Sequence, residues 1–201
     1  MRNTIQLNVG PVSDNDSSEL PVYCDIGYYA GITATDWSWT PLLTDFNNDG
    51  YRDLVICNGF PKDITDHDFA TFRSKAYKIA AKNEILSQVP VVKLHNYAFM
   101  NNGNLTFSDV SEEWGMSEPT FSNGAAYADL DLDGDMDIVI NNINDEASIL
   151  RNNTIEINNS SDNYLKIRLI WTDRNKDGIG SIVRIYYDKG KQQIWENTPI
   201  S

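Results

Sequence analysis

Two short acidic segments of this chain have the residue types and the spacing of a metal-binding loop. Both carry oxygen-bearing side chains at positions 1, 3, 5 and 9 and glycine at position 6. Calcium takes about six to eight oxygen ligands, and such a loop surrounds one ion with alternate side chains and the carbonyl at position 7. The predicted metal residues are Asp45, Asn47, Asp49, Tyr51 and Asp53 in the first segment, and Asp129, Asp131, Asp133, Asp135 and Asp137 in the second.

Electrostatics favours a bound cation over a simple turn. Five aspartates fall within the nine residues 129–137, and like charges this close repel unless a cation lies among them or some are protonated. Turn chemistry alone explains an Asp-Gly pair in either segment. It does not explain acid at alternate positions in two copies. We therefore predict two calcium ions.

The residues after each loop exclude an EF-hand. That motif needs a bidentate glutamate at position 12, followed by a helix. Position 12 is Ile56 in one segment and Ile140 in the other, each within an apolar run typical of a strand. A third acidic segment contains Asp173, Asn175 and Asp177, but Arg174 and Lys176 alternate with them. A β-turn is the favoured interpretation there, and a third calcium site is not expected.

The loops belong to a repeat, because the pattern of residues 23–58 returns 84 positions later, in residues 107–142. A second phrase, a short strand ending in an Asn-rich turn, occurs at residues 4–8, 97–101 and 148–152. Residues 65–88 interrupt the first copy and have helical spacing of apolar residues. Without this insertion the repeat has about the forty-odd residues of a propeller blade.

These patterns predict a mainly β chain: a partial β-propeller of about two blades with one inserted helix, followed by a small β module. The expected domains are the end of a preceding blade (1–35), a blade with the helical insertion (36–113), a second blade (114–157) and the module (163–201). Within the module, residues 164–171 and 181–187 alternate as strands do, and residues 193–195 begin another. The module looks shortened, so the chain is expected to be a fragment of a longer protein.

The bulk composition limits the possible partners. Lys and Arg total 16 against 29 Asp and Glu, a net charge of −13. Such a chain repels nucleic acid, whose binding needs clustered basic residues. No segment has the roughly 20 apolar residues of a transmembrane helix, and no signal peptide is visible at the N-terminus. Cys24 and Cys57 could form one disulfide, but two buried free thiols are the more common case.

We find no catalytic motif in the sequence, so an enzyme is not expected. His67 lies between two aspartates near the start of the insertion, and His95 precedes a strand; neither has the spacing of a metal ligand. Five aromatic residues are candidates for a binding face, with core packing between blades as the favoured alternative. They are Tyr28, Tyr29, Trp37, Trp39 and Trp114.

The segment Phe121 to Val139 resembles the FG-GAP/VCBS repeat, the calcium-binding blade also seen in integrin α-subunits, and Asp36 to Gly59 resembles a preceding copy. Residues 173–185 are similar to the ASPIC/UnbV module, which follows such repeats in proteins akin to cartilage acidic protein and their bacterial relatives. The resemblance implies a β-propeller, structural calcium, a secreted, periplasmic or cell-surface location, and adhesion or binding of a protein or carbohydrate.

Two other functions stay open at this stage. The chain could be part of a glycan-processing enzyme whose active residues lie outside it, or its tryptophans could form a sugar-binding surface.

Overall fold

The computed structural model describes residues 2–10, 21–62, 67–76, 89–158, 165, 167–170, 174–187 and 191–197. The chain divides into two compact units, Met1–Asn158 and Asn159–Ser201. Antiparallel strand pairs dominate both units, which confirms the prediction of a mainly β fold with propeller-like sheets.

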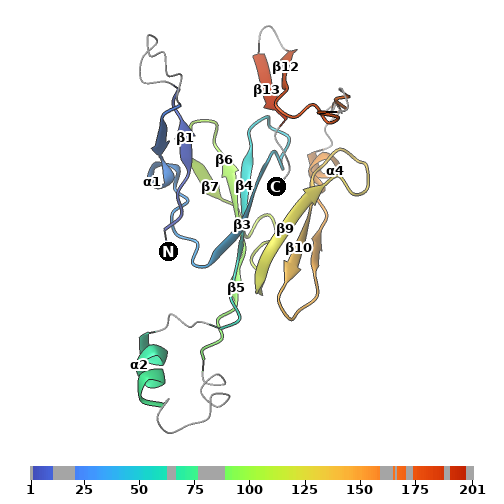
Figure 1. Cartoon of the computed structure of the whole chain (residues 1–201). Helices are drawn as coiled ribbons and strands as arrows, with labels where there is room; N and C mark the ends of the chain where they lie inside the picture. Colours follow the sequence, from blue (N-terminus) through green and yellow to red (C-terminus); the bar gives the residue numbers. More distant parts are fainter. Residues whose placement is uncertain are drawn as a thin grey trace. The chain divides into compact units, whose positions relative to one another are not determined.

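The first blade is a four-stranded antiparallel sheet with the order β3-β4-β6-β7 (Figure 1). Its strands are β3 (Ser38–Thr44), β4 (Asp53–Asn58), β6 (Tyr97–Asn101) and β7 (Phe107–Asp109). Every residue of β4 is buried, because this strand has a neighbour on each side and packing on both faces.

The second blade repeats the first three strands of this pattern. Its sheet has the order β11-β10-β9, formed by β9 (Ser122–Ala128), β10 (Asp137–Asn142) and β11 (Ser148–Leu150). The bounds of β9 and β10 are those of β3 and β4 shifted by 84 residues. The structure thus confirms the repeat that the sequence predicts.

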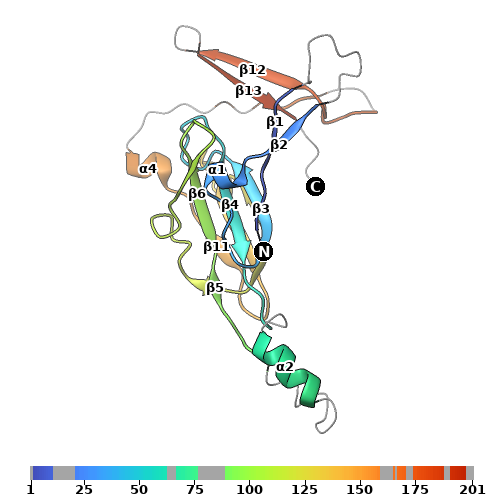
Figure 2. The same ribbon diagram turned by 90° about the vertical axis from the view of Figure 1, so that its left-hand side faces the viewer.

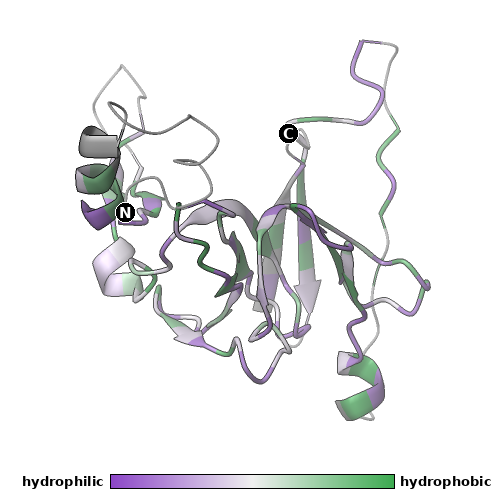
Figure 3. Ribbon diagram, turned by 90° about the horizontal axis from the view of Figure 1, so that it is seen from below, coloured by the Kyte–Doolittle hydropathy of each residue, from purple (hydrophilic) through white to green (hydrophobic). Residues whose placement is uncertain are grey.

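The main hydrophobic core lies between the two blades. Val55 and Ala98 of the first blade are fully buried, and Ile138 and Ile140 of the second belong to the same cluster. Figure 2 shows the first blade turned by 90°, and Figure 3 shows apolar stretches along the strands of both sheets. Alternation of side chains along a strand explains why one face of β10 meets the first blade.

A second, smaller core covers the opposite face of the first blade. Leu54, Ile56 and Phe99 pack there against Ala30 and Ile32. Strands β1 (Gln6–Asn8) and β2 (Tyr23–Asp25) form a hairpin, which is followed by the one-turn helix α1 (Gly27–Ala30). Ala30 is the last residue of α1, and Ile32 lies just after it.

A buried chain of polar side chains also joins the two blades. The Asn96 side chain accepts from the Asn58 backbone N–H at 2.8 Å and donates to Ser122 Oγ at 3.0 Å; Ser122 Oγ donates to Asn142 Oδ1 at 2.8 Å. Asn96 follows β5 (Leu94–His95), which pairs with β8 (Pro119–Thr120). Asn96, Ser122 and Asn142 therefore each have the hydrogen-bond partner that a buried polar side chain needs.

The predicted insertion contains a helix, α2 (His67–Ala76), which confirms helical structure there. Residues 65, 66 and 77–88 of the insertion lie outside the described residues. A further short helix, α4 (Thr154–Asn158), follows the second blade. Among the described residues, no helix has the length and apolar character needed to cross a membrane.

In the described part of the C-terminal unit, β12 (Ile182–Tyr187) and β13 (Lys191–Glu196) form an antiparallel hairpin. These strands confirm two of the three predicted in the module. The predicted strand at residues 164–171 is wrong for its described part, residues 165 and 167–170, which form no strand. An alternating pattern makes a strand only where a partner strand takes up its backbone hydrogen bonds.

Two expectations about side chains need correction. Both cysteines are free, as expected, but Cys24 is exposed and only Cys57 is buried. Core packing is wrong for Tyr28 and Tyr29, which lie on the exposed side of α1 at 74% and 64% exposure. Trp37 and Trp39 stack on Phe60, with Trp39 still 42% exposed, and Trp114 packs on the main core.

The tight core between the blades makes a direct prediction. Ile140 is 1% exposed, so Ile140→Ala should lower the free energy of unfolding by about 2–5 kcal/mol, measured by urea denaturation. Ile149→Ala is the matched control, because Ile149 is 68% exposed and its change should cost no more than about 0.5 kcal/mol. Equal losses in the two variants would contradict this packing.

Candidate metal centre

The first acidic loop connects β3 to β4 and turns its polar side chains toward its own backbone. Asp45 accepts hydrogen bonds from the N–H groups of Asp49 (3.1 Å) and Gly50 (2.9 Å). Asn47 Oδ1 also accepts from Asp49 N–H, at 3.1 Å, and Asp49 Oδ1 accepts from Tyr51 N–H, at 2.8 Å. The side chains at positions 1, 3 and 5 therefore converge on one turn, as the spacing predicts.

The second acidic loop connects β9 to β10 and brings three carboxylates together. One oxygen from each of Asp129, Asp131 and Asp133 lies within 4.8 Å of the other two. Asp129 Oδ1 is buried and has no hydrogen-bond partner. A buried carboxylate oxygen without a partner is costly, and a cation held among the three oxygens would satisfy it. These three aspartates fit a metal ion.

The same two backbone positions are left-handed in both loops. At position 4, φ is 60° for Asn48 and 64° for Leu132. At position 6, φ is 92° for Gly50 and 103° for Gly134. Glycine adopts such angles without strain, whereas leucine does not. A bulky residue held at positive φ indicates that the loop path is imposed by its surroundings.

The aspartate at position 9 ties the second loop to its sheet. Asp137 is 2% exposed, and its two oxygens accept from Leu130 N–H (2.9 Å) and Asn152 N–H (2.8 Å). Leu130 stands at the start of the loop, whereas Asn152 lies just after β11. One carboxylate thus closes the loop and anchors the strand beside it.

Asp53 plays the same part in the first loop. It is fully buried and accepts from Asn101 N–H (2.9 Å) and Phe46 N–H (3.0 Å). Burial raises the pKa of Asp53 to about 6; these two hydrogen bonds oppose the rise, and the charges of Asp49 and Asp45 add to it. Burial likewise raises the pKa of Asp45.

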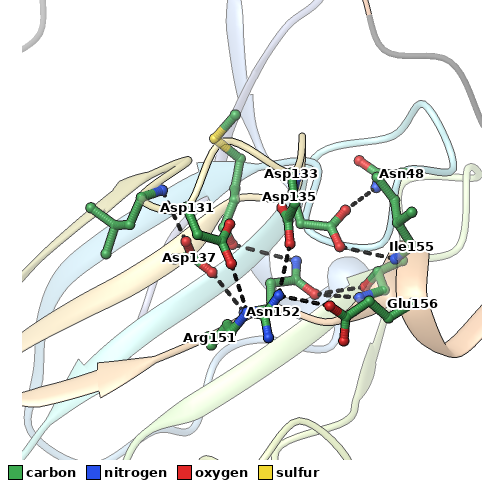
Figure 4. A network of polar contacts seen from close by, with 12 residues as sticks. Asn48, Asp131, Asp133, Asp135, Asp137, Arg151, Asn152, Ile155 and Glu156 are labelled. Atoms are coloured by element: carbon green, nitrogen blue, oxygen red, sulfur yellow. Dashed lines mark hydrogen bonds and ion pairs between the residues drawn. The ribbon is translucent and has the colours of Figure 1, made fainter.

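Asp135, at position 7 of the second loop, directs its side chain away from Asp131 and Asp133 (Figure 4). It is fully buried and accepts from Asn48 Nδ2 at 2.6 Å and from Ile155 N–H at 2.9 Å. Its metal role would therefore use the backbone carbonyl, as the loop pattern predicts for position 7. Tyr51 holds the same position in the first loop, with its side chain half exposed.

Hydrogen bonds join the two loops. Asn48, which donates to Asp135, belongs to the first loop. In addition, the Phe46 carbonyl of the first loop accepts from Asn152 Nδ2 at 2.7 Å and from Thr154 Oγ1 at 3.3 Å. Asn152 also donates its N–H to Asp137, the aspartate at position 9 of the second loop. Asn152 therefore connects that aspartate to Phe46 at the start of the first loop.

Sequence reasoning missed Arg151 as a residue of this site. Its guanidinium donates to Asp131 at 2.7 Å, Asp133 at 3.4 Å and Glu156 at 2.7 Å (Figure 4). Loss of hydration at Asp131 raises the pKa of its carboxyl, but the hydrogen bond and charge of Arg151 outweigh this effect and hold that pKa below its usual value. Arg151 stands where the repeat has Met100, and this difference between the copies is the signal that could have revealed it.

The other predicted candidates lie apart from the two loops. His95 Nδ1 donates to the Asn96 carbonyl (2.7 Å), and its ring lies 4.4 Å from that of Tyr97, so it packs at a strand. His67 begins α2. In the third acidic segment, the Asn175 side chain donates to and accepts from the Ile179 backbone. This is turn chemistry, as favoured; Asp173 lies outside the described residues.

Comparison with protein families identifies one repeat in this chain. Residues 84–140 match the family model of the FG-GAP-like repeat. The match covers β5 to β9, the whole of the second acidic loop from Asp129 to Asp137, and the first part of β10. A search of curated proteins found no match. FG-GAP is a non-catalytic type of repeat, which agrees with the lack of a catalytic motif in the sequence. Residues 84–140 of this chain are therefore similar to the FG-GAP-like repeat.

The raised pKa of Asp53 predicts how the metal-free protein responds to acid. The folded chain binds a proton at Asp53 below about pH 6, whereas an unfolded chain binds it only near pH 3.8. The folded state therefore gains stability, through this group, as the pH falls from about 7 to about 4. We therefore expect that, in chelator, the free energy of unfolding of the native chain rises relative to that of Asp53→Asn as the pH falls from about 7 to about 4. Urea denaturation at each pH measures this difference. A difference that is constant or shrinks would contradict the shift.

Proposed function

We propose that this chain is a calcium-binding interaction module of the β-propeller type, in which calcium is mainly structural. The observation that carries the proposal is the cluster of Asp129, Asp131 and Asp133, together with the unpartnered oxygen of Asp129. All of the side-chain donors at positions 1, 3, 5 and 9 of the two loops are oxygens, the ligand type that calcium prefers. The FG-GAP-like repeat at residues 84–140 supports the same function.

Calcium would act by offsetting repulsion within loops that also connect the blades. Arg151 supplies one positive charge to the second cluster, but it is shared with Glu156 and leaves Asp129 Oδ1 without a hydrogen bond. A doubly charged ion at the three carboxylates would satisfy the buried oxygen and hold the turn. Because Asp135 and Asn152 join the two loops, an ordered second loop would also stabilise the first.

The partner is a protein or a carbohydrate outside the cytoplasm. Extracellular calcium modules bind the ion at roughly 0.1–1 mM, a concentration that fills them outside the cell. The net charge of −13 disfavours nucleic acid. Tyr28 and Tyr29, exposed on α1, are the residues that we assign to partner contact, since exposed aromatics supply contact area at low entropic cost. The C-terminal unit is proposed to be of the ASPIC/UnbV type.

Calcium removal tests the function. Calcium at about 100 times its dissociation constant stabilises the folded state by about 2.7 kcal/mol per site, which corresponds to a rise in Tm of roughly 5–10 °C for a chain of this size. Differential scanning fluorimetry in calcium and in chelator measures the shift, and isothermal titration calorimetry should count two ions.

Matched variants separate the loops from the remaining acidic surface. Asp133→Asn removes one clustered carboxylate and should abolish one site in the titration. Asp145→Asn is the control, because Asp145 is exposed, pairs with Lys93 and belongs to neither loop. The proposal fails if calcium leaves the native Tm unchanged, or if the two variants lose calcium binding equally.

A further inference from the structure

The two blades differ in their fourth strand. In the first blade, β7 pairs with β6 and completes the sheet. In the second blade, β11 is the counterpart of β6, and among the described residues no strand pairs with its other side. After β11 the described chain continues into α4, where the first blade turns back into β7.

The backbone of Ile149 faces this open side. Its counterpart in the first blade is Ala98, whose carbonyl accepts from Val110 N–H at 2.9 Å and whose N–H donates to Ser111 Oγ at 3.0 Å. Val110 and Ser111 directly follow β7. By the repeat, the N–H and carbonyl of Ile149 point to the position that a fourth strand would occupy. An open strand edge of this kind accepts another strand.

A cavity of about 390 Å³ lies beside β11. Four of the residues that line it are repeat counterparts of residues in the smaller core of the first blade. There, Ala30, Ile32, Leu54 and Phe99 pack against Phe107 of β7; here the corresponding residues are Trp114, Met116, Ile138 and Leu150. The cavity therefore lies where the aromatic side chain of a fourth strand would pack. Ile157 of α4 lines it but is 77% exposed, so it does not fill the space.

An unpaired acceptor in the same place points to the same missing strand. Asn102, just after β6, accepts a hydrogen bond at Oδ1 from Ser108 Oγ of β7 at 3.1 Å. Its counterpart in the second blade is Asn153, which lines the cavity. Asn153 Oδ1 is buried and has no hydrogen-bond partner. The acceptor is in place and its donor, a hydroxyl on the fourth strand, is not.

We propose that the open edge of β11 and the adjoining cavity bind an extended strand from a protein partner. The strand carries the pattern of Phe107 to Val110: an aromatic residue, a small hydroxyl residue, aspartate and an aliphatic residue. It pairs antiparallel with β11, as β7 does with β6, places its aromatic ring in the cavity and donates its hydroxyl to Asn153. Strand addition of this type takes affinity from the backbone and specificity from alternate side chains. The inference does not depend on calcium.

The first blade supplies the probe. A fluorescently labelled peptide with the sequence of residues 104–111 should bind the full chain saturably, measured by fluorescence anisotropy in calcium-containing buffer. The same peptide with Phe107→Asp should not bind, because it lacks the ring that would pack on Trp114, Ile138 and Leu150, and a carboxylate placed against these apolar side chains is desolvated. Absence of saturable binding by the native peptide at millimolar concentrations would overturn the proposal.

Variants of the chain test the edge and the acceptor separately. Ile149→Pro removes the outward N–H at an exposed edge position that tolerates proline, and should weaken binding about tenfold or more relative to Ile149→Ala, which keeps the N–H. Melting curves verify that both variants fold. Equal affinities for the two variants would overturn the edge assignment.

A double-mutant cycle tests the predicted hydroxyl contact. The native chain should prefer the native peptide over its Ser108→Ala version by about three- to tenfold, and Asn153→Ala should erase that preference. A preference that survives in Asn153→Ala would contradict the contact.

The chain's own β2 has a similar pattern at Tyr23 to Ile26, with Tyr23 exposed. If the chain self-associates and Tyr23→Asp abolishes that self-association, the strand that binds at β11 comes from a second copy of this chain. That result would overturn the proposal of a separate protein partner.

Discussion

A buried carboxylate that accepts two backbone N–H groups is the interaction on which both blades depend. Asp53 and Asp137 each receive one N–H from the start of their own loop and one from an asparagine, which is the last residue of β6 in the first blade and lies just after β11 in the second. Charge-assisted hydrogen bonds of this kind are among the stronger ones, and removing either partner leaves a buried group unsatisfied. Loop path, strand pairing and the position of the clustered oxygens are therefore set together.

This tie makes the two acidic loops parts of one structure. Asn152 donates its backbone N–H to Asp137 and its side chain to the Phe46 carbonyl, so the end of the second blade holds the start of the first loop. The contact between Asn48 and Asp135 adds a second connection. Positive φ at Leu132 is tolerated because the surrounding contacts fix the loop. A charge bound in one loop therefore affects the hydrogen bonds that join both loops and, through them, both blades.

The parts of the fold that repeat could be predicted from the sequence, because a recurring pattern of strand and turn residues fixes local structure and register together. The 84-residue repeat correctly places β9 and β10 from β3 and β4. The convergence of the aspartates follows from their spacing. The predictions that are wrong depend on distant contacts: the exposure of Tyr28, and the lack of a strand at residues 167–170. Arg151 is missed because its role arises only when β11 lies beside the loop.

The repeat positions at which the two blades carry different residues show how the second blade is exposed to solvent. Cys57 is buried and Met100 packs on the core between the blades, whereas their counterparts Asn141 and Arg151 are exposed. At these two positions polar residues thus replace apolar ones on the face of the second blade that points away from the first, whereas Ile149, the counterpart of Ala98, stays apolar and exposed there. Terminal units of repeat proteins need such a polar outer face. The inner face, with Ile138 and Ile140, stays apolar. Among the described residues, the unsatisfied features of this blade lie at the edge of β11, in the cavity beside it, at Asn153 Oδ1 and, in the acidic loop, at Asp129 Oδ1.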